Sequence, residues 1–407
     1  MSAPTITSVR AYVVEPGNDG EAGGSGPAGG ADYHAQAGAH WIDDHIATPM
    51  GRYPQYRASR RSFGLDVLGS LVVVVEASDG STGLGVTTAG EIGAWIVERH
   101  LARFVEGARV TDLERIWDQM YAATLFYGRR GVVLNAISGV DLALWDLLGR
   151  VRAEPVYAML GGAVRDELAC YATGPRPDLA AGMGFVGGKL PLHHGPAEGP
   201  DGLRANLDLL ARMRDAVPDG FFLSYDCWMA LDVDYTVRLG HAALDLGLKW
   251  IEEPLPPDDY WGYGEARRRL PAQLWLTGGE HEATRWGFRA LLELGGVDMI
   301  QPDVGWCGGL TELLKIDALA STRGVPVVPH GSSVYSYHYA ITRPGSPFTE
   351  FLMMHPDGTQ VVPMFAPLLV GEPTPEAGRI GLSALGERPG FGVELNPQIA
   401  LRRPYSR

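Results

Sequence analysis

Phe221-Phe-Leu-Ser-Tyr-Asp226 is a short apolar run that ends on a carboxylate, and the chain repeats this design twice. Leu248–Glu252 and Leu274–Glu280 also end on acids, so that 26 and then 28 residues separate the three carboxylates. This interval accommodates one strand, one helix and two loops, which is the repeat of a (β/α) barrel. The carboxyl ends of barrel strands surround one open mouth, and we expect the three carboxylates to meet there.

Three carboxylates at one mouth predict a bound cation. Like charges held close together repel strongly unless a positive charge neutralises them. The expected ligands Asp226, Glu252 and Glu280 offer hard oxygen atoms and include no cysteine, a donor set that favours Mg²⁺. The pattern therefore indicates a metal-dependent enzyme.

An acid and a histidine continue the same rhythm. Asp303 ends the strand-like run Asp298–Asp303, and His330 ends Val325–His330, 27 residues later. We interpret His330 as a candidate base that faces the metal. Asp303, one strand earlier, can accept a hydrogen bond from the other imidazole nitrogen, which fixes the tautomer and raises the basicity of the ring.

The second half of the chain alternates strand-like and helical stretches from about residue 165. Helical patterns such as 203–216 and 235–246 separate the apolar runs, so a closed parallel α/β barrel is predicted. The expected strands are Leu168–Ala172, Phe185–Leu190, Phe221–Asp226, Leu248–Glu252, Leu274–Glu280, Asp298–Asp303, Val325–His330 and Phe348–Met353.

The first part of the chain has a different order, with strands followed by helices. Residues 4–15 alternate as a strand would, and Leu71–Glu76 and Thr82–Thr88 flank an Asp-Gly turn typical of a hairpin. Thr111–Glu114 has the pattern of a capping box, and apolar spacing predicts a second helix over about Val133–Gly149. These features indicate an α+β domain.

Length and composition set the domain organisation. A chain of 407 residues exceeds the size at which one core keeps growing, so two domains are expected. We place a capping domain at 1–160, a barrel at 161–355, and a Pro- and Gly-rich segment at 356–407 that folds back onto the capping domain. Residues 17–31, dominated by Gly, Ala and Ser, are expected to form a flexible surface loop.

Charge and cysteine content exclude some classes of protein. A formal net charge of −14 argues against nucleic-acid binding, which rewards clustered Lys and Arg. We find no apolar run near the ~20 residues that cross a bilayer and no secretory pattern at the start of the chain, so we expect no membrane partner. Cys170, Cys227 and Cys307 are odd in number and far apart, as expected for reduced thiols in the cytoplasm.

Sequence motifs along nearly the whole chain resemble the enolase superfamily, in its mandelate racemase-like branch, and within it the L-rhamnonate dehydratases. The superfamily motifs are Ala136-Ile-Ser-Gly-Val-Asp141-Leu-Ala-Leu-Trp145-Asp146, Leu160-Gly-Gly162, the acids and histidine named above, and Pro389-Gly-Phe-Gly-Val-Glu-Leu395. The motifs of the narrower group are Asp32-Tyr-His34, residues 41–50, Ser59-Arg60-Arg-Ser-Phe-Gly64, Gln301-Pro-Asp-Val-Gly-Trp-Cys-Gly-Gly309, Pro329-His-Gly-Ser-Ser-Val-Tyr335 and Arg403-Pro-Tyr-Ser406.

The resemblance implies a (β/α)7β-type barrel, a Mg²⁺ cofactor, a homo-oligomer such as an octamer, and dehydration of L-rhamnonate to 2-keto-3-deoxy-L-rhamnonate. It also implies roles for ten residues. These are the metal ligands Asp226, Glu252 and Glu280, the catalytic His330, Asp303 and Glu350, and the substrate-binding His34, Arg60, His281 and Lys189.

Two details of the catalytic set follow from the resemblance. Glu350 is expected to assist as a protonated hydrogen-bond donor, since burial keeps a carboxylic acid neutral. Many racemases of this branch carry Lys-x-Lys on the second strand, whereas this chain has Lys189-Leu-Pro191. A two-base racemisation is therefore not expected, and His330 is expected to act both as base and as the acid for the leaving group. Lys189 is expected to neutralise the substrate carboxylate.

Other interpretations remain open at this stage. The substrate can be another aldonate, such as L-mannonate or L-lyxonate, or the barrel can bind a metal or a sugar acid without catalysis. A metal-dependent hydrolase is also conceivable, although it predicts several histidine ligands. His40, His45, His193 and His194 are possible ligands, yet hydrogen-bonded structural roles are the simpler expectation.

Overall fold

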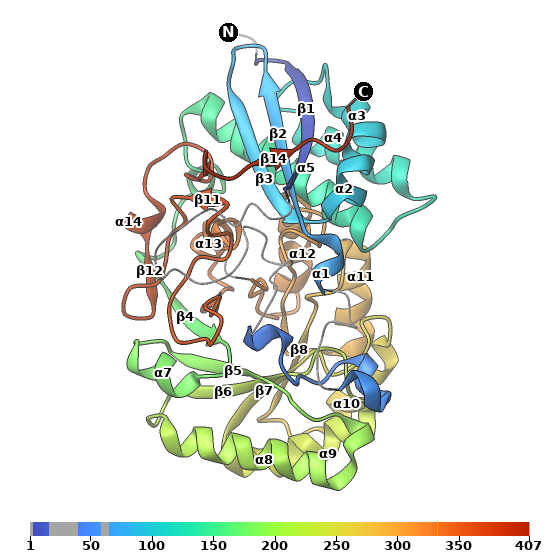
Figure 1. The fold of residues 1–407 in the computed structure, drawn as a ribbon, viewed down its shortest axis with the longest axis vertical. Coiled ribbons are helices and arrows are strands. Elements are labelled where there is room, and N and C mark those ends of the chain that lie inside the picture. Colours follow the sequence, from blue (N-terminus) through green and yellow to red (C-terminus); the bar gives the residue numbers. More distant parts are fainter. Residues whose placement is uncertain (1–2, 16–39, 58–64, 332, 407) are drawn as a thin grey trace.

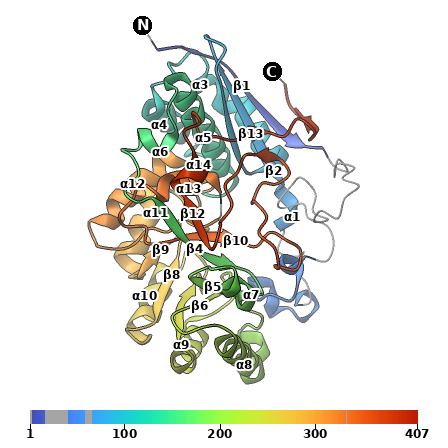
Figure 2. The ribbon, with the colours of Figure 1, turned by 90° about the vertical axis from the view of Figure 1, so that its left-hand side faces the viewer.

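The computed structural model describes residues 3–15, 40–57, 65–331 and 333–406. A small α+β unit, which contains both described ends of the chain, lies above a larger barrel of strands and helices (Figures 1 and 2). The C-terminal segment runs from the side of the barrel up to the α+β unit (Figure 1). The expected α/β barrel with an N-terminal cap is therefore confirmed.

The cap is built on an antiparallel sheet with the strand order β14-β1-β2-β3. The expected hairpin is present, because β2 and β3 pair from Ser70 with Thr88 to Glu76 with Thr82. The elements are β1 (Ile6–Val14), β2 (Ser70–Ala77), β3 (Thr82–Thr88), β14 (Leu401–Arg402), α1 (Leu65–Leu68), α2 (Gly90–Ile96), a π-helical turn (Val97–Leu101), α3 (Ala102–Val105), α4 (Leu113–Thr124), α5 (Val132–Arg152) and α6 (Val156–Met159).

Helix α5 packs directly against β2 and β3. Two glycines make this approach possible, since a Cβ on Gly83 would lie 2.1 Å from the carbonyl oxygen of Ala143, and one on Gly85 2.1 Å from that of Gly139. By length and hydropathy alone α5 could cross a membrane, but 89% of its most apolar window is buried inside the protein. Such burial is typical of the central helix of a packed domain.

The expected capping box before α4 is wrong. Asp112, not Thr111, occupies the N-cap position, and its side chain makes no capping hydrogen bond. The Asp112 carboxylate instead pairs with Arg109 at 3.0 Å and with Arg115 at 2.7 Å. The Asp112 carboxylate is therefore engaged with these arginines and does not cap the helix, while the apolar face of the helix is buried as expected.

The barrel strands follow one another in the order β10-β4-β5-β6-β7-β8-β9, and every pairing between them is parallel. The strands are β4 (Glu167–Thr173), β5 (Gly187–Pro191), β6 (Phe222–Asp226), β7 (Leu248–Glu252), β8 (Trp275–Gly278), β9 (Met299–Ile300) and β10 (Thr349–Leu352). The helices are α7 (Pro177–Gly182), α8 (Gly199–Ala216), α9 (Val233–Ala243), α10 (Tyr260–Arg269), α11 (Thr284–Ala290), α12 (Leu310–Ser321) and α13 (Val334–Ala340).

Three of the expected strands are shorter or weaker than the apolar pattern indicates. Val325–His330 forms only isolated bridges, between Val327 and Ile300 and between His330 and Asp303. This run contains Pro326 and Pro329, which have no N–H group to donate to a ladder. The strand β9 likewise stops before Pro302. Strand β8 ends at Gly278, so Glu280 lies just beyond it, after Gly279 with a φ of +121°.

The C-terminal segment joins both parts of the molecule. Its strand β12 (Arg379–Gly381) pairs with β4 of the barrel, and β14 pairs with β1 of the cap. Asp146 of α5 accepts hydrogen bonds from the backbone of Phe391 at 2.8 Å and of Leu84 at 2.9 Å. The segment also contains β11 (Leu369–Val370), α14 (Leu382–Leu385) and β13 (Glu394–Leu395).

His338 of α13 lies where three of these segments meet. It is fully buried, accepts a hydrogen bond from the backbone N–H of Tyr157 at 3.1 Å, and contacts the rings of Tyr157 and Phe391. Burial lowers the pKa of His338 from 6.5 to about 3. Between pH 6.5 and about pH 3 the unfolded chain binds a proton at His338 that the folded chain excludes. The free energy of unfolding is therefore highest above the unfolded-state pKa and falls as the pH is lowered below it.

The substitution His338→Phe tests this argument. It removes the hydrogen bond from Tyr157, and we expect a loss of about 1 kcal/mol at neutral pH. It also removes the titration, so the stability gap between about pH 7 and about pH 5 should shrink by about 2 kcal/mol relative to wild type. Urea unfolding at the two pH values measures this change. An unchanged gap would show that His338 does not stay neutral in the fold.

Candidate active site

Three acids converge at the carboxyl ends of neighbouring barrel strands. Asp226 is the last residue of β6, Glu252 is the last of β7, and Glu280 follows β8. Each is nearly buried, with a relative exposure of 5% or less. One carboxylate oxygen from each lies within 4.8 Å of the others. The barrel topology thus brings together three oxygen donors that are 26 and 28 residues apart in sequence.

These carboxylates are costly to keep charged without a cation. Burial raises the pKa of Glu252 to about 8, although Lys189 opposes the shift, and burial raises the pKa of Glu280 to about 7, against the effect of His330. Closely spaced oxygen donors with suppressed ionisation are what a hard divalent cation stabilises. The donor set therefore fits Mg²⁺.

A second group of possible ligands shares Glu280 but fits Mg²⁺ less well. Glu253, Glu280 and His281 also place one donor atom each within 4.8 Å of the others. Both oxygens of Glu253 are occupied by His281. Oε1 accepts a hydrogen bond from the backbone N–H of His281 at 3.1 Å, and Oε2 pairs with Nδ1 of the same residue at 2.6 Å. The group also includes an imidazole, which Mg²⁺ accepts less readily than oxygen.

The histidine and aspartate expected at the mouth form a pair. Nδ1 of His330 lies 2.9 Å from Oδ2 of Asp303, and Nε2 of His330 lies 3.3 Å from Oε1 of Glu280. Burial would lower the pKa of His330, but Glu280, then Glu350 and Asp303, outweigh it and raise the pKa to about 10. Asp303 is itself held by the backbone N–H of Gly305 at 2.6 Å. The imidazole nitrogen that Asp303 does not hold therefore faces Glu280, one of the three acids at the mouth.

Glu350 differs from the expected protonated donor. Its Oε1 accepts a hydrogen bond from Thr173 at 2.5 Å and pairs with Nζ of Lys189 at 2.8 Å. Its Oε2 accepts a hydrogen bond from the backbone N–H of Gly331 at 2.8 Å. Burial would raise the pKa of Glu350, but Lys189 and His330 outweigh it and lower the pKa to about 2. Every group bonded to Glu350 is a donor, so the carboxylate is ionised.

Lys189 is fully buried and bonded to carboxylates. Its Nζ lies 3.3 Å from Oδ2 of Asp226 and also forms ion pairs with Glu252 and Glu350. These contacts raise the pKa of Lys189 despite burial, which alone would lower it. The ammonium group is therefore committed to the protein's own acids, and the expected neutralisation of a substrate carboxylate would have to compete with them.

His281 lies beside the same mouth and is the most accessible of the described substrate-binding candidates. Its side chain is 25% exposed, and its ring packs between Trp228 and Trp306, with centroids 5.6 and 5.5 Å away. Burial would lower the pKa of His281, but Glu253 and then Glu280 raise it to about 9. A positively charged imidazole there suits an anionic ligand. His34 and Arg60, the other two candidates, lie outside the described residues.

Sequence reasoning missed two side chains that orient the cluster. Glu253 holds His281, and Gln301 donates a hydrogen bond to Oε2 of Glu252 at 2.5 Å. The only sequence signal for Glu253 is its position next to Glu252. Gln301 stands within a motif of the resemblance, but its partner on β7 becomes apparent only when β8 and β9 are placed in the barrel.

Comparisons with known proteins agree with this geometry. Residues 62–161 match the family model described as "Mandelate racemase / muconate lactonizing enzyme, N-terminal domain", and residues 179–399 match "Enolase C-terminal domain-like". The chain belongs to the enolase superfamily. Within it, the protein falls in the mandelate racemase/muconate lactonizing enzyme branch, as the sequence motifs predicted.

Individual members of this superfamily are similar over nearly the whole chain. An L-rhamnonate dehydratase from Saccharopolyspora erythraea is 68% identical over 377 residues, which are 93% of this chain and 96% of that protein. A crystal structure of rhamnonate dehydratase from Gibberella zeae, complexed with Mg, is 45% identical with a TM-score of 0.92 and covers 98% of this chain and 97% of its own.

A more distant solved structure matches in fold alone. The 3,6-anhydro-D-galactonate cycloisomerase from Zobellia galactanivorans is 24% identical with a TM-score of 0.74 and covers 96% of this chain and 97% of its own. A protein with a different named activity therefore has the same fold, and the fold by itself does not select a substrate.

The adjacent pair Glu252 and Glu253 allows a matched test of the metal site in this superfamily member. Glu252→Gln removes a charged oxygen donor, and we expect Mg²⁺ affinity to fall by at least about 100-fold, since a single outer-shell change already costs about 10–100-fold. Glu253→Gln alters an equally buried neighbour and should change the affinity by less than about 10-fold. Isothermal titration calorimetry measures both. If Glu253→Gln lowered the Mg²⁺ affinity more than Glu252→Gln, the ion would bind at Glu253, Glu280 and His281 instead.

Proposed function

We propose that this protein is a Mg²⁺-dependent hydro-lyase that dehydrates L-rhamnonate to 2-keto-3-deoxy-L-rhamnonate and water. The observation that carries this proposal is the 68% identity to an L-rhamnonate dehydratase over 93% of the chain. The buried acids and the His330–Asp303 pair support it, because they supply the charge and the base that the reaction needs.

Asp226, Glu252 and Glu280 are the proposed Mg²⁺ ligands. A proton next to a carboxylate is very weakly acidic, and its removal places extra negative charge on the carboxylate oxygens. When bound, Mg²⁺ supplies the positive charge that stabilises these oxygens in the transition state. The ligands are held in position by neighbours, since Glu252 accepts hydrogen bonds from Gln301 and from Nε1 of Trp250.

His330 is the proposed base and acid. Asp303 occupies its Nδ1, so Nε2 is the nitrogen that takes the proton from C2. The electron pair of the broken C–H bond forms the C2=C3 double bond as the 3-hydroxyl leaves. The protonated His330 returns its proton to this hydroxyl, which departs as water. The enol that remains gains a proton at C3, loses the proton of its C2 hydroxyl, and so becomes the 2-keto-3-deoxy acid.

Charged groups around the base prepare it for this role. Glu350 and Asp303, which are not among the proposed metal ligands, stabilise the protonated imidazole that forms after proton transfer. Lys189 keeps Glu350 ionised and oriented, and it has no second lysine two residues later to act as an opposing base. His281, together with His34 and Arg60, is proposed to bind the sugar acid. The same resemblance supports a homo-oligomer in the cytoplasm. Sedimentation velocity would measure the mass of this oligomer.

Substitution of the base tests the mechanism. His330→Asn should lower kcat by at least about 10³-fold and abolish deuterium exchange at C2, because a positioned base contributes about 10²–10⁴-fold. Asp303→Asn keeps the base but loosens its orientation, and we expect a smaller loss of about 10–100-fold. Mg²⁺ affinity measured by calorimetry serves as the control for folding. Retained turnover in His330→Asn would remove this residue from the role of base.

A panel of aldonates tests the substrate. L-Mannonate has a hydroxyl on C6, whereas C6 of L-rhamnonate is a methyl group. L-Lyxonate has no C6. A single methyl or hydroxyl difference in an apolar pocket changes kcat/KM by only about 10–200-fold, so we expect weak turnover of both and the highest kcat/KM for L-rhamnonate. Higher kcat/KM for another acid sugar would overturn the substrate, and no turnover of any would favour a binding protein.

A further inference from the structure

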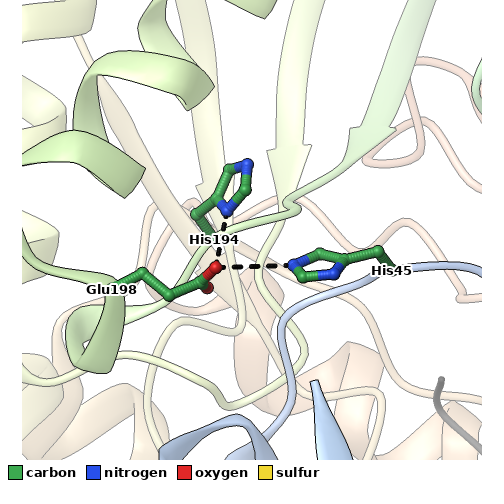
Figure 3. A group of neighbouring side chains, drawn as sticks. All are labelled: His45, His194 and Glu198. Carbon is green, nitrogen blue, oxygen red and sulfur yellow. Dashed lines mark hydrogen bonds and ion pairs between the residues drawn. The ribbon is translucent and has the colours of Figure 1, made fainter. Parts of the chain in front are cut away.

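A second cluster of possible metal ligands lies outside the acids of the mouth. His45, His194 and Glu198 point toward one another from two separate parts of the chain (Figure 3). His45 belongs to the described segment 40–57, shortly after a 3₁₀ turn at Trp41–Asp43. His194 and Glu198 lie between β5 and α8, with Glu198 closing a short 3₁₀ helix.

The two imidazole rings face one carboxylate oxygen of Glu198. Oε1 of Glu198 lies 2.8 Å from Nδ1 of His194 and 3.5 Å from Nε2 of His45. One donor atom from each residue lies within 4.8 Å of the other two. The side chains are 19–37% exposed, so an ion from solution can reach them. The imidazole rings are 5.2 Å apart and tilted by 49°, and both face the same oxygen.

The two ligands from the barrel are held before any ion binds. Oε2 of Glu198 accepts a hydrogen bond from the backbone N–H of Gly195 at 3.1 Å, which leaves Oε1 to face the histidines. The backbone of His194 is held on both sides by the buried side chain of Asn206, at 3.1 and 2.8 Å. The hydroxyl of Tyr235 adds a bond to the carbonyl of His194 at 3.0 Å. Ligands fixed in this way lose little freedom on binding.

The segment that carries His45 is attached to the barrel at both sides of this residue. The backbone N–H of Ala47 donates to the carbonyl of Leu192 at 2.8 Å, and Nε1 of Trp41 donates to the carbonyl of Met353 at 2.7 Å. These bonds bring His45 to residues that are about 150 positions away in sequence. The cluster is therefore a product of the tertiary fold.

A cavity beside the cluster provides room for a further ligand. It has a volume of about 410 Å³, and its lining includes His45, Glu198, His193 and Asp232. Burial, followed by the neighbouring His194 and His45, lowers the pKa of His193, so this ring is neutral. Burial would raise the pKa of Glu198, but bonds from His194 and Gly195 outweigh it and lower the pKa, so its carboxylate is charged.

We propose that His45, His194 and Glu198 form a second metal site that binds a zinc-type divalent ion and links segment 40–57 to the barrel. Two imidazole nitrogens and one carboxylate oxygen are a donor set that suits Zn²⁺, with a fourth position left for water. Mg²⁺ prefers oxygen donors in an octahedron and is not expected to compete. The two sites of this protein thus select different ions by their ligands.

Zinc titration of the whole protein in saturating Mg²⁺ tests this proposal. We expect wild type to bind one equivalent of Zn²⁺ that His45→Asn and His194→Asn both lose. His193→Asn is the matched control, because it removes an adjacent histidine of the same cavity and should retain the equivalent. Glu252→Gln disables the site at the mouth and should also retain it. Metal analysis after gel filtration counts the ions, and circular dichroism checks that each variant is folded.

Two further readouts separate this site from the barrel mouth. Co²⁺ in place of Zn²⁺ should give a visible d–d spectrum that His45→Asn removes and Glu252→Gln leaves. Zn²⁺ should also raise the unfolding temperature of wild type in saturating Mg²⁺ but not that of His45→Asn, because it stabilises only the state that binds it. An equal zinc count in wild type and His45→Asn would overturn the proposal, as would loss of the equivalent in His193→Asn or Glu252→Gln.

Discussion

Repulsion among buried carboxylates is the constraint on which the active site depends. Lys189 contacts Asp226, Glu252 and Glu350, while Glu280 and Asp303 face the single ring of His330. Two cationic groups therefore stand against five acids, an imbalance that is costly in a buried site. A divalent cation relieves it. The parallel strands hold the acids close together. This enforced proximity causes the repulsion, and the repulsion in turn gives the site its affinity for a metal ion.

The sequence predicts those parts of the site that depend on strand ends and topology. A carboxylate at the end of a strand points to the barrel mouth wherever the strand lies, so regular spacing was enough to bring together Asp226, Glu252 and Glu280. The ionisation of Glu350 was not predictable in this way. It depends on Lys189 of β5, which reaches Glu350 of β10 across the intervening strand β4, and that contact exists only once these three strands have paired.

Strand and helix boundaries were less predictable, for local reasons. The apolar run Val325–His330 has the composition of a strand, but its two prolines cannot donate to a ladder, and only bridges form. Thr111 has the spacing of a capping residue, but the N-cap position falls on Asp112, whose carboxylate pairs with Arg109 and Arg115. In both cases the apolar pattern placed the element correctly, and individual backbone or charge effects moved its end.

The link between segment 40–57 and the barrel bears on substrate recognition, because of where this segment lies in the chain. Arg57 donates to the carbonyl oxygens of Gly51 at 2.7 Å and Ala197 at 3.4 Å, the latter next to Glu198. Arg60, a residue proposed to bind the sugar, follows Arg57 by three positions in the sequence. A metal ion on His45 would therefore hold the described segment that comes directly before this part of the sequence.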